Sequence, residues 1–167
     1  MYKVLAILCV FGLLVSCDDS PRNEIYNENN TTVVNGVVYN IDEEPINGIY
    51  KIYYPNGNVR MEIESRRGKP DGQGKFYDKA GNLLYEAAFK DGVIDGKMFN
   101  YYENGKIHNE MSYENGVLDG VQKTYDEDGK VTSEITFAKG KAVSGYANIK
   151  EQKIDFVPEE LAELNKM

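Results

Sequence analysis

The sequence is poor in the residues that usually build catalytic, metal-binding or redox sites. Its 167 residues include two cysteines, one histidine and no tryptophan. Both cysteines, Cys9 and Cys17, lie near the N-terminus, which excludes a disulfide framework for the rest of the chain. Metal binding and nucleophilic catalysis need convergent His, Cys or carboxylate groups that no motif here provides. We therefore expect no metal, no cofactor, no catalytic residue and no enzymatic activity.

Positive charge and long apolar runs are also scarce. The formal net charge is -8, and a surface of this sign repels nucleic acid, so we expect no nucleic-acid partner. The apolar run from Val4 to Val15 is shorter than the roughly 20 residues that a transmembrane helix needs. What the chain does have is 13 tyrosines and 16 glycines, a composition that favours strands joined by tight turns.

The N-terminus has the layout of a secretory signal peptide: Lys3, the apolar run, and the small residue Ser16 directly before Cys17. The junction Leu14-Val15-Ser16-Cys17 resembles the lipobox of bacterial lipoproteins, in which the cysteine is acylated, for example with palmitate. The resemblance implies a signal peptide over residues 1–16, lipidation of Cys17, export from the cytoplasm, and lipid anchoring to a membrane of the cell envelope. The leaflet stays open, and an ordinary signal peptide with a chance cysteine is the alternative.

A polar segment follows the cysteine. It carries almost no apolar spacing, and we interpret residues 17–32 as the lipidated cysteine and a flexible tether.

An internal repeat occupies the middle of the chain. Gly48, Gly72, Gly96 and Gly120 are spaced by 24 residues, and five further positions on there is always a tyrosine. Columns of glycine, glutamate and glycine follow at fixed offsets in every unit. We assign the repeat array to residues 33–145, with full units at 48–71, 72–95, 96–119 and 120–144, and interpret Val37 to Gly48 as a half-unit before them.

Each unit is interpreted as strand, turn, strand, turn. The first turn is either a two-residue type I′ loop or a type I turn followed by a glycine bulge; Pro55 and Ala80 favour the second form. In that register, alternation predicts that the repeat tyrosines lie on the apolar side of the sheet with Met61 and Ile63, and that the glutamates lie on the opposite side. Lysines, hydroxyl groups or water must then separate the stacked glutamates.

The repeat resembles the MORN type in its bacterial variant form. The resemblance is based on the Tyr-x-x-x-Gly spacing, the Asn-Gly and Asp-Gly turns, and the segments Gly92-Val93-Ile94-Asp95-Gly96 and Gly116-Val117-Leu118-Asp119-Gly120. The resemblance implies an all-β fold, an elongated antiparallel β-meander of hairpin repeats used as an interaction surface or spacer. Many bacterial members are labelled antitoxin components of toxin-antitoxin systems.

These observations predict a membrane-anchored lipoprotein that acts as a non-catalytic protein-binding or scaffolding module; the alternative is an antitoxin or immunity protein. The partner is a protein or an envelope polymer. The candidate partner-binding residues lie in the middle units, where an acidic ladder would favour cationic or neutral ligands. They are Tyr77, Tyr101, Tyr125, Glu86 and Glu110.

Two further features do not follow the repeat pattern. His108 lies within a strand without an implied partner, and we interpret it as a surface residue. Residues 146–167 are predicted to form a C-terminal cap, with a short helix over Phe156–Leu164 in which Leu161 and Leu164 cover the open end of the sheet.

Overall fold

The computed structural model describes residues 25–149, 152–156 and 165–166, which form strands and turns. Among these residues no helix is long and apolar enough to span a membrane. The strands are β1 (Ile25–Asn27), β2 (Thr31–Val34), β3 (Val37–Asn40), β4 (Gly48–Tyr53), β5 (Val59–Arg66), β6 (Lys69–Tyr77), β7 (Leu83–Lys90), β8 (Val93–Tyr101), β9 (Ile107–Glu114), β10 (Val117–Leu118), β11 (Gly120–Tyr125), β12 (Val131–Ala138), β13 (Lys141–Ile149) and β14 (Gln152–Asp155).

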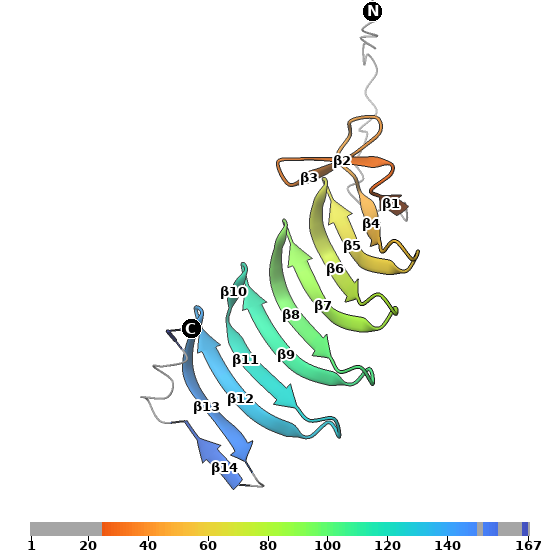
Figure 1. Ribbon diagram of the computed structural model, residues 1–167. Helices are drawn as coiled ribbons and strands as arrows, with labels where there is room; N and C mark the ends of the chain where they lie inside the picture. The colour runs from red at the N-terminus through yellow and green to blue at the C-terminus, as the bar shows by residue number, and fades with distance from the viewer. Residues whose placement is uncertain (1–24, 150–151, 157–164, 167) are drawn as a thin grey trace, which may run out of the picture.

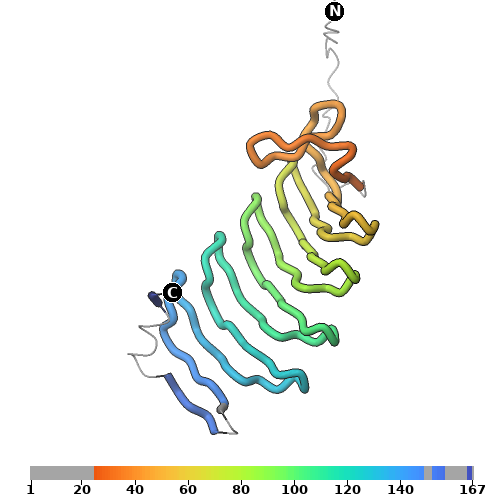
Figure 2. The backbone as a smooth tube through the Cα atoms, viewed as in Figure 1, coloured from red at the N-terminus to blue at the C-terminus, as the bar shows by residue number. Residues whose placement is uncertain are grey.

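The strands confirm the predicted all-β array. A 12-stranded sheet has the order β1-β4-β5-β6-β7-β8-β9-β11-β12-β13-β14, with β10 beside β9, while β2 and β3 form a separate two-stranded sheet. From β4 to β14, neighbouring strands of the sheet are antiparallel and close to each other in sequence, as expected for stacked hairpins. Figures 1 and 2 show these hairpins as one elongated layer whose strands bend along their length.

One edge of the array carries the predicted type I turns with a glycine bulge. In the first unit the Gly57 N–H donates to the Tyr54 carbonyl at 2.9 Å, and the Tyr54 N–H donates to the Asn58 carbonyl at 2.8 Å. Gly57 has a φ of 88°, a left-handed conformation that glycine adopts without a steric penalty. The same bonds recur in the other three units, which explains why a glycine stands at this position each time.

The opposite edge carries two-residue type I′ turns. Arg67 and Gly68 both have positive φ, at 51° and 74°, as this turn type requires. Each turn is also bonded to the unit before it: the Gly92 N–H donates to the Pro70 carbonyl and the Gly116 N–H to the Ile94 carbonyl, both at 2.8 Å.

Side chains add a second bond between units at this edge. The acceptors are the residues just before the opening glycines, which accept from the backbone N–H of the next turn: Asn47 from Arg67 (2.9 Å), Asp95 from Asn115 (3.1 Å) and Asp119 from Lys139 (2.9 Å). These acceptors therefore bond unit one to the segment before it, unit three to unit two, and unit four to unit three.

At the bulged-turn edge the links between units alternate. The Tyr54 hydroxyl donates to the Tyr77 carbonyl at 2.8 Å, and the Tyr102 hydroxyl donates to the Tyr125 carbonyl at 2.7 Å. Units two and four have Asp78 and Asp126 at the same position, and these carboxylates accept backbone N–H groups of their own turns instead. These tyrosine links join unit one to two and unit three to four.

The predicted placement of the repeat tyrosines is wrong. Tyr53 pairs with Val59 while Ile52 pairs with Met61, so β5 contributes one extra residue at this point. The bulge reverses the alternation between Val59 and Met61. Met61 therefore shares a face with Ile52, and the tyrosine column lies on the glutamate face, not on the apolar face.

The N-terminal end is more structured than the sequence predicts. Ile25–Asn27, expected to be part of the tether, is strand β1 and pairs in parallel with β4. Val37–Asn40, expected to be a half-unit of the array, pairs with β2 instead and crosses the end of the main sheet (Figure 1). Apolar burial holds the hairpin against the sheet, because Val38 of β3 and Ile46 of the following segment are buried with Tyr50 and Ile63.

The C-terminal end differs from the N-terminal one. β13 continues to Ile149, beyond the expected end of the array, and pairs with β14, which forms the last strand of the sheet. Asn165 returns to β13, where its side-chain amide bonds both the N–H and the carbonyl of Ala142. The helix predicted over Phe156–Leu164 falls on residues 157–164, which lie outside the described residues.

Candidate binding face

A row of side chains crosses the sheet from β4 to β13 on the glutamate face. Its members stand directly opposite one another on neighbouring strands, and we call it the charged row: Lys51, Glu62, Lys75, Glu86, Phe99, Glu110, Lys123, Glu134 and Tyr146. From Lys51 to Glu86 cation and anion alternate, as they do again from Glu110 to Glu134. Opposite charges at facing positions stabilise a sheet, whereas facing like charges would destabilise it.

Ion pairs within and beside this row neutralise most of the glutamates. Lys51 Nζ lies 2.7 Å from Glu62 Oε2, and Lys123 Nζ lies 3.7 Å from Glu134 Oε2. Lys97, on β8 beside the row, bonds Glu110. The predicted separation of the glutamates by lysines and hydroxyl groups is therefore confirmed, and the glutamate column is not a free acidic ladder.

The tyrosine column supplies the hydroxyl groups. The Tyr101 hydroxyl donates to Glu86 Oε1 at 2.6 Å, and the Tyr125 hydroxyl donates to Glu110 Oε2 at 3.1 Å. Four of the five candidate residues thus form two linked pairs on one face. Tyr77 belongs to the same column, and its carbonyl receives the hydroxyl of Tyr54.

These contacts shift the ionisation of the face. Burial raises the pKa of Tyr101, and the hydrogen bond to Glu86 raises it further. Burial and the bond to Glu110 act in the same way on the pKa of Tyr125. The bond from Lys97, followed by that from Tyr125, lowers the pKa of Glu110 below its usual range against the opposing effect of burial. At neutral pH Tyr101 and Tyr125 are therefore neutral phenols, and Glu110 is an ionised carboxylate.

Phe99 interrupts the charged row. It stands where the other three units have lysines, between Glu86 on β7 and Glu110 on β9. Sequence reasoning missed this residue, although the column Lys51, Lys75, Phe99, Lys123 contains the signal. The interruption leaves one carboxylate on each side of an aromatic ring, with no lysine between them in the row.

The opposite face carries a second row, which we call the graded row: Ile52, Met61, Phe76, Tyr85, Asn100, Asn109, Thr124 and Ser133. In its first half Phe76 stacks on Tyr85 with ring centroids 4.2 Å apart. In its second half the Thr124 hydroxyl bonds Asn109 Oδ1 at 3.0 Å. The apolar half packs against the core of the N-terminal end.

His108 contacts its neighbours at the bulged edge. Its ring lies 4.4 Å from the ring of Tyr102, and its Nδ1 lies 3.2 Å from the side-chain amide of Asn109. The remaining predicted site residue, Cys17, lies outside the described residues.

The geometry defines the class of protein: a single-layer array of β-hairpin repeats with polar side chains bonded across units. A family model described as "MORN repeat variant" matches residues 46–65, 70–91, 94–115 and 118–139, more than half of the chain. The chain belongs to this family. The four matches correspond to the four predicted units, with each starting two residues earlier.

No curated protein matches the sequence. Among solved structures, one similar chain comes from "Crystal structure of GtfA/B complex", at 14% identity and a TM-score of 0.24. The match covers 80% of this chain and only 21% of the other, and a likeness of this degree carries no argument about function.

Proposed function

We propose that the protein is an exported lipoprotein, anchored to a membrane of the cell envelope through acylated Cys17, whose repeat array is a non-catalytic module for binding or scaffolding another protein. The Leu14-Val15-Ser16-Cys17 junction supports the anchor. Membership of a repeat family supports the role of the array, because stacked units present the same side chains at regular intervals along an extended surface.

The observation that carries the binding function is the interruption of the charged row at Phe99. Elsewhere in the row a lysine stands between successive glutamates, but Glu86 and Glu110 flank an aromatic ring; Glu110 pairs with Lys97 beside the row, and Glu86 accepts the Tyr101 hydroxyl. A lysine or arginine of a partner can place its aliphatic stem over that ring and its charge between the two carboxylates. The partner completes the row that the array leaves incomplete.

An extended partner suits this face best. Each unit adds two strands about 4.8 Å apart, so equivalent side chains recur about every 10 Å. A basic, extended polypeptide segment can therefore contact Phe99 and at the same time reach the tyrosine column on either side. Tyr77, Tyr101 and Tyr125 offer contact area at a low cost in rotamer entropy.

Filling the interruption tests the site. Phe99→Lys restores the alternation of charge found in the rest of the row, so we expect it to leave folding intact and to reduce capture of the partner at least tenfold. Phe99→Leu, the matched control, keeps an apolar group without adding charge and should weaken capture less. The combined variant Glu86→Gln and Glu110→Gln should make the remaining capture insensitive to salt. Unchanged capture by Phe99→Lys would contradict this site.

Identification of the partner requires the protein in its own cells. Affinity purification of the lipidated chain after chemical cross-linking separates a protein partner from an envelope polymer. Recovery of a stoichiometric complex with a toxin encoded beside this protein would support the alternative role of antitoxin or immunity protein. Recovery of a polymer alone would exclude the protein-binding role.

The anchor is tested independently of the partner. Mass spectrometry of the mature N-terminus should find an acylated cysteine at position 17, and Cys17→Ser should move the protein from the detergent phase to the aqueous phase. A mature chain that keeps residues 1–16, or that carries an unmodified cysteine, would contradict the anchor.

A further inference from the structure

The hairpin β2–β3 is unusual for its lack of charge. No charged residue occurs from Asn29 to Ile41, in a chain in which 28% of residues are charged. Several of its apolar side chains are exposed to solvent: Val33 is 58% exposed, Val34 is 50% exposed and Ile41 is 79% exposed. Val33 and Val34 are adjacent at the turn end of the hairpin, and exposed apolar groups gathered in this way mark a surface that another phase or molecule covers.

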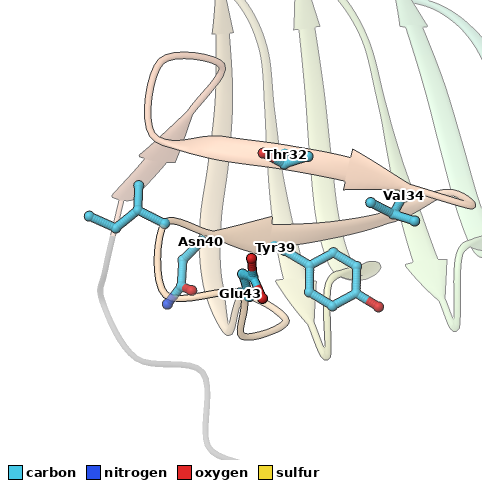
Figure 3. A pocket seen from close by; sticks show the side chains of 6 residues that line it. Thr32, Val34, Tyr39, Asn40 and Glu43 are labelled. Atoms are coloured by element: carbon cyan, nitrogen blue, oxygen red, sulfur yellow. The ribbon is translucent and has the colours of Figure 1, made fainter. Parts of the chain in front are cut away.

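A shallow groove of about 420 Å³ follows the hairpin. Figure 3 shows Val34 and Tyr39 toward the turn of the hairpin, with Asn40 and Glu43 farther from it. The groove has an apolar residue at each end: Val34 near the turn, and Ile41 at the other end. The acidic residues Asp42, Glu43 and Glu44 follow Ile41 in the loop that leads back to the main sheet.

Basic side chains lie at the same corner of the molecule. Arg66, Arg67, Lys69 and Lys90 line one cavity together with Asp71 and Asp91. The turn between Arg66 and Lys69 is bonded to the hairpin, because the Val38 N–H donates to the Gly68 carbonyl at 2.8 Å. The Gly68 N–H donates to the carbonyl of Ile46, in the segment that follows the hairpin. The Arg66 Nε–H group is buried and has no hydrogen-bond partner among the described residues.

We propose that this corner docks on the lipid bilayer, with Val33 and Val34 inserted at the level of the headgroups and the basic cluster against the lipid phosphates. An apolar group beside cationic side chains is the combination that binds a membrane interface. The proposal rests on the lipid anchor proposed above. Docking fixes the direction in which the array leaves the membrane, so that the face around Phe99 is held at a defined height.

The short segment between Cys17 and Ile25 keeps this corner within reach of the bilayer. Eight residue steps separate Cys17 from Ile25, the first described residue, and even fully extended they span at most about 28 Å. A lipid on Cys17 thus keeps the N-terminal end of the array close to the bilayer. Val143, an equally exposed valine at 53%, lies on β13 at the far end of the array and provides a matched control.

Tryptophan fluorescence can test the docking, because the chain has no tryptophan of its own. Full-length lipidated Val34→Trp and Val143→Trp are reconstituted separately into vesicles of phosphatidylethanolamine and phosphatidylglycerol. We expect a blue-shifted emission that brominated acyl chains quench for Val34→Trp, and an unshifted, unquenched emission for Val143→Trp. Adding Lys69→Gln and Lys90→Gln to Val34→Trp should weaken docking about fivefold for each charge removed; Lys79→Gln, at the other edge of the array, should have no effect.

The outcomes separate docking from anchoring. If the Val34→Trp protein floats with the vesicles but its tryptophan emission is not quenched, the docking is overturned and the anchor stays intact. Protein that does not float would overturn the anchor and this docking with it. A blue shift that depends on protein concentration and not on vesicles would assign the hairpin to a contact between two copies of the chain, which would also overturn the proposal.

Discussion

The two halves of the graded row differ in their side chains: the first half is apolar and the second is polar. In units one and two, Ile52, Met61, Phe76 and Tyr85 form an apolar surface that continues into a buried core. In units three and four, Asn100, Asn109, Thr124 and Ser133 occupy the same positions and bond partly to one another. The turn hydrogen bonds and the bulged strand pairing recur in both halves. The comparison shows that turns and strand pairing define the repeat, while the side chains of this face vary with what covers them.

The largest expected effect is the loss of stability when an apolar side chain is truncated, which should differ between the two halves. Ile63 is 5% exposed and packs in the N-terminal core, whereas Met111, its equivalent two units later, is half-buried. We expect Ile63→Ala to lower the free energy of unfolding by about 2 to 4 kcal/mol, because it leaves a cavity, and Met111→Ala to lower it by roughly half as much. Urea unfolding followed by circular dichroism measures both. Equal losses would mean that the two halves are equally well packed.

A smaller effect concerns the type I′ edge, which both halves share. Asn47→Ala and Asp119→Ala each remove the side-chain acceptor for a turn N–H of the next unit. We expect each to cost about 1 kcal/mol, because a hydrogen bond is lost at a site that water reaches in part. Urea unfolding of the two variants checks this. A clearly larger loss for Asn47→Ala would show that the difference between the halves extends to their turns.

The smallest expected effect is the pH dependence of the Glu110 contacts. Because folding lowers the pKa of Glu110, its contribution to stability is fully present above the ordinary value of 4.5 and is lost as the pH falls through the lowered pKa. The group is partly exposed, so we expect only a few tenths of a kcal/mol. The difference in stability between wild type and Glu110→Gln should be largest at neutral pH and disappear in acid. A difference that grows in acid would reverse the assigned sign.

The Lys51 ion pair in the first half behaves oppositely. The hydrogen bond to Glu62 raises the pKa of Lys51 above 10.5. Its contribution is therefore fully present below pH 10.5 and is lost only as the pH rises through the raised pKa. The difference in stability between wild type and Lys51→Gln should therefore disappear in alkali, as the pH rises through the raised pKa of Lys51; an alkaline titration of urea unfolding measures this.

The sequence predicted those parts of the fold that depend on local backbone chemistry. The glycine columns predicted both kinds of tight turn position, and the bulged form at Gly57 followed from Pro55 and Ala80. The faces were harder, because one extra residue between Val59 and Met61 reverses the alternation and leaves no clear mark in composition. The parallel pairing of β1 could not be predicted either, since it depends on a contact with β4, far along the chain.

The candidate site was also predictable only in part, because its residues were visible in the sequence but their contacts were not. The tyrosine and glutamate columns were visible as repeated letters, but their direct bonding, as in Tyr101 to Glu86, depends on which face the bulge selects. The neutralising lysines were expected only as one of several possibilities. Phe99 was readable in principle as an exception within a lysine column, and it became meaningful once strand register placed it between two carboxylates.

The alternating tyrosine links at the bulged-turn edge have a consequence for how such a chain can change its length. Tyr54 and Tyr102 each join an odd unit to the even unit that follows, whose own aspartate closes its turn. Each tyrosine link uses a backbone carbonyl of the repeat tyrosine, which every unit has, and each aspartate bonds only its own turn. Whole units can therefore be deleted or duplicated one at a time without removing the bonding partners of these turn residues, which makes the single hairpin the self-sufficient module of this array.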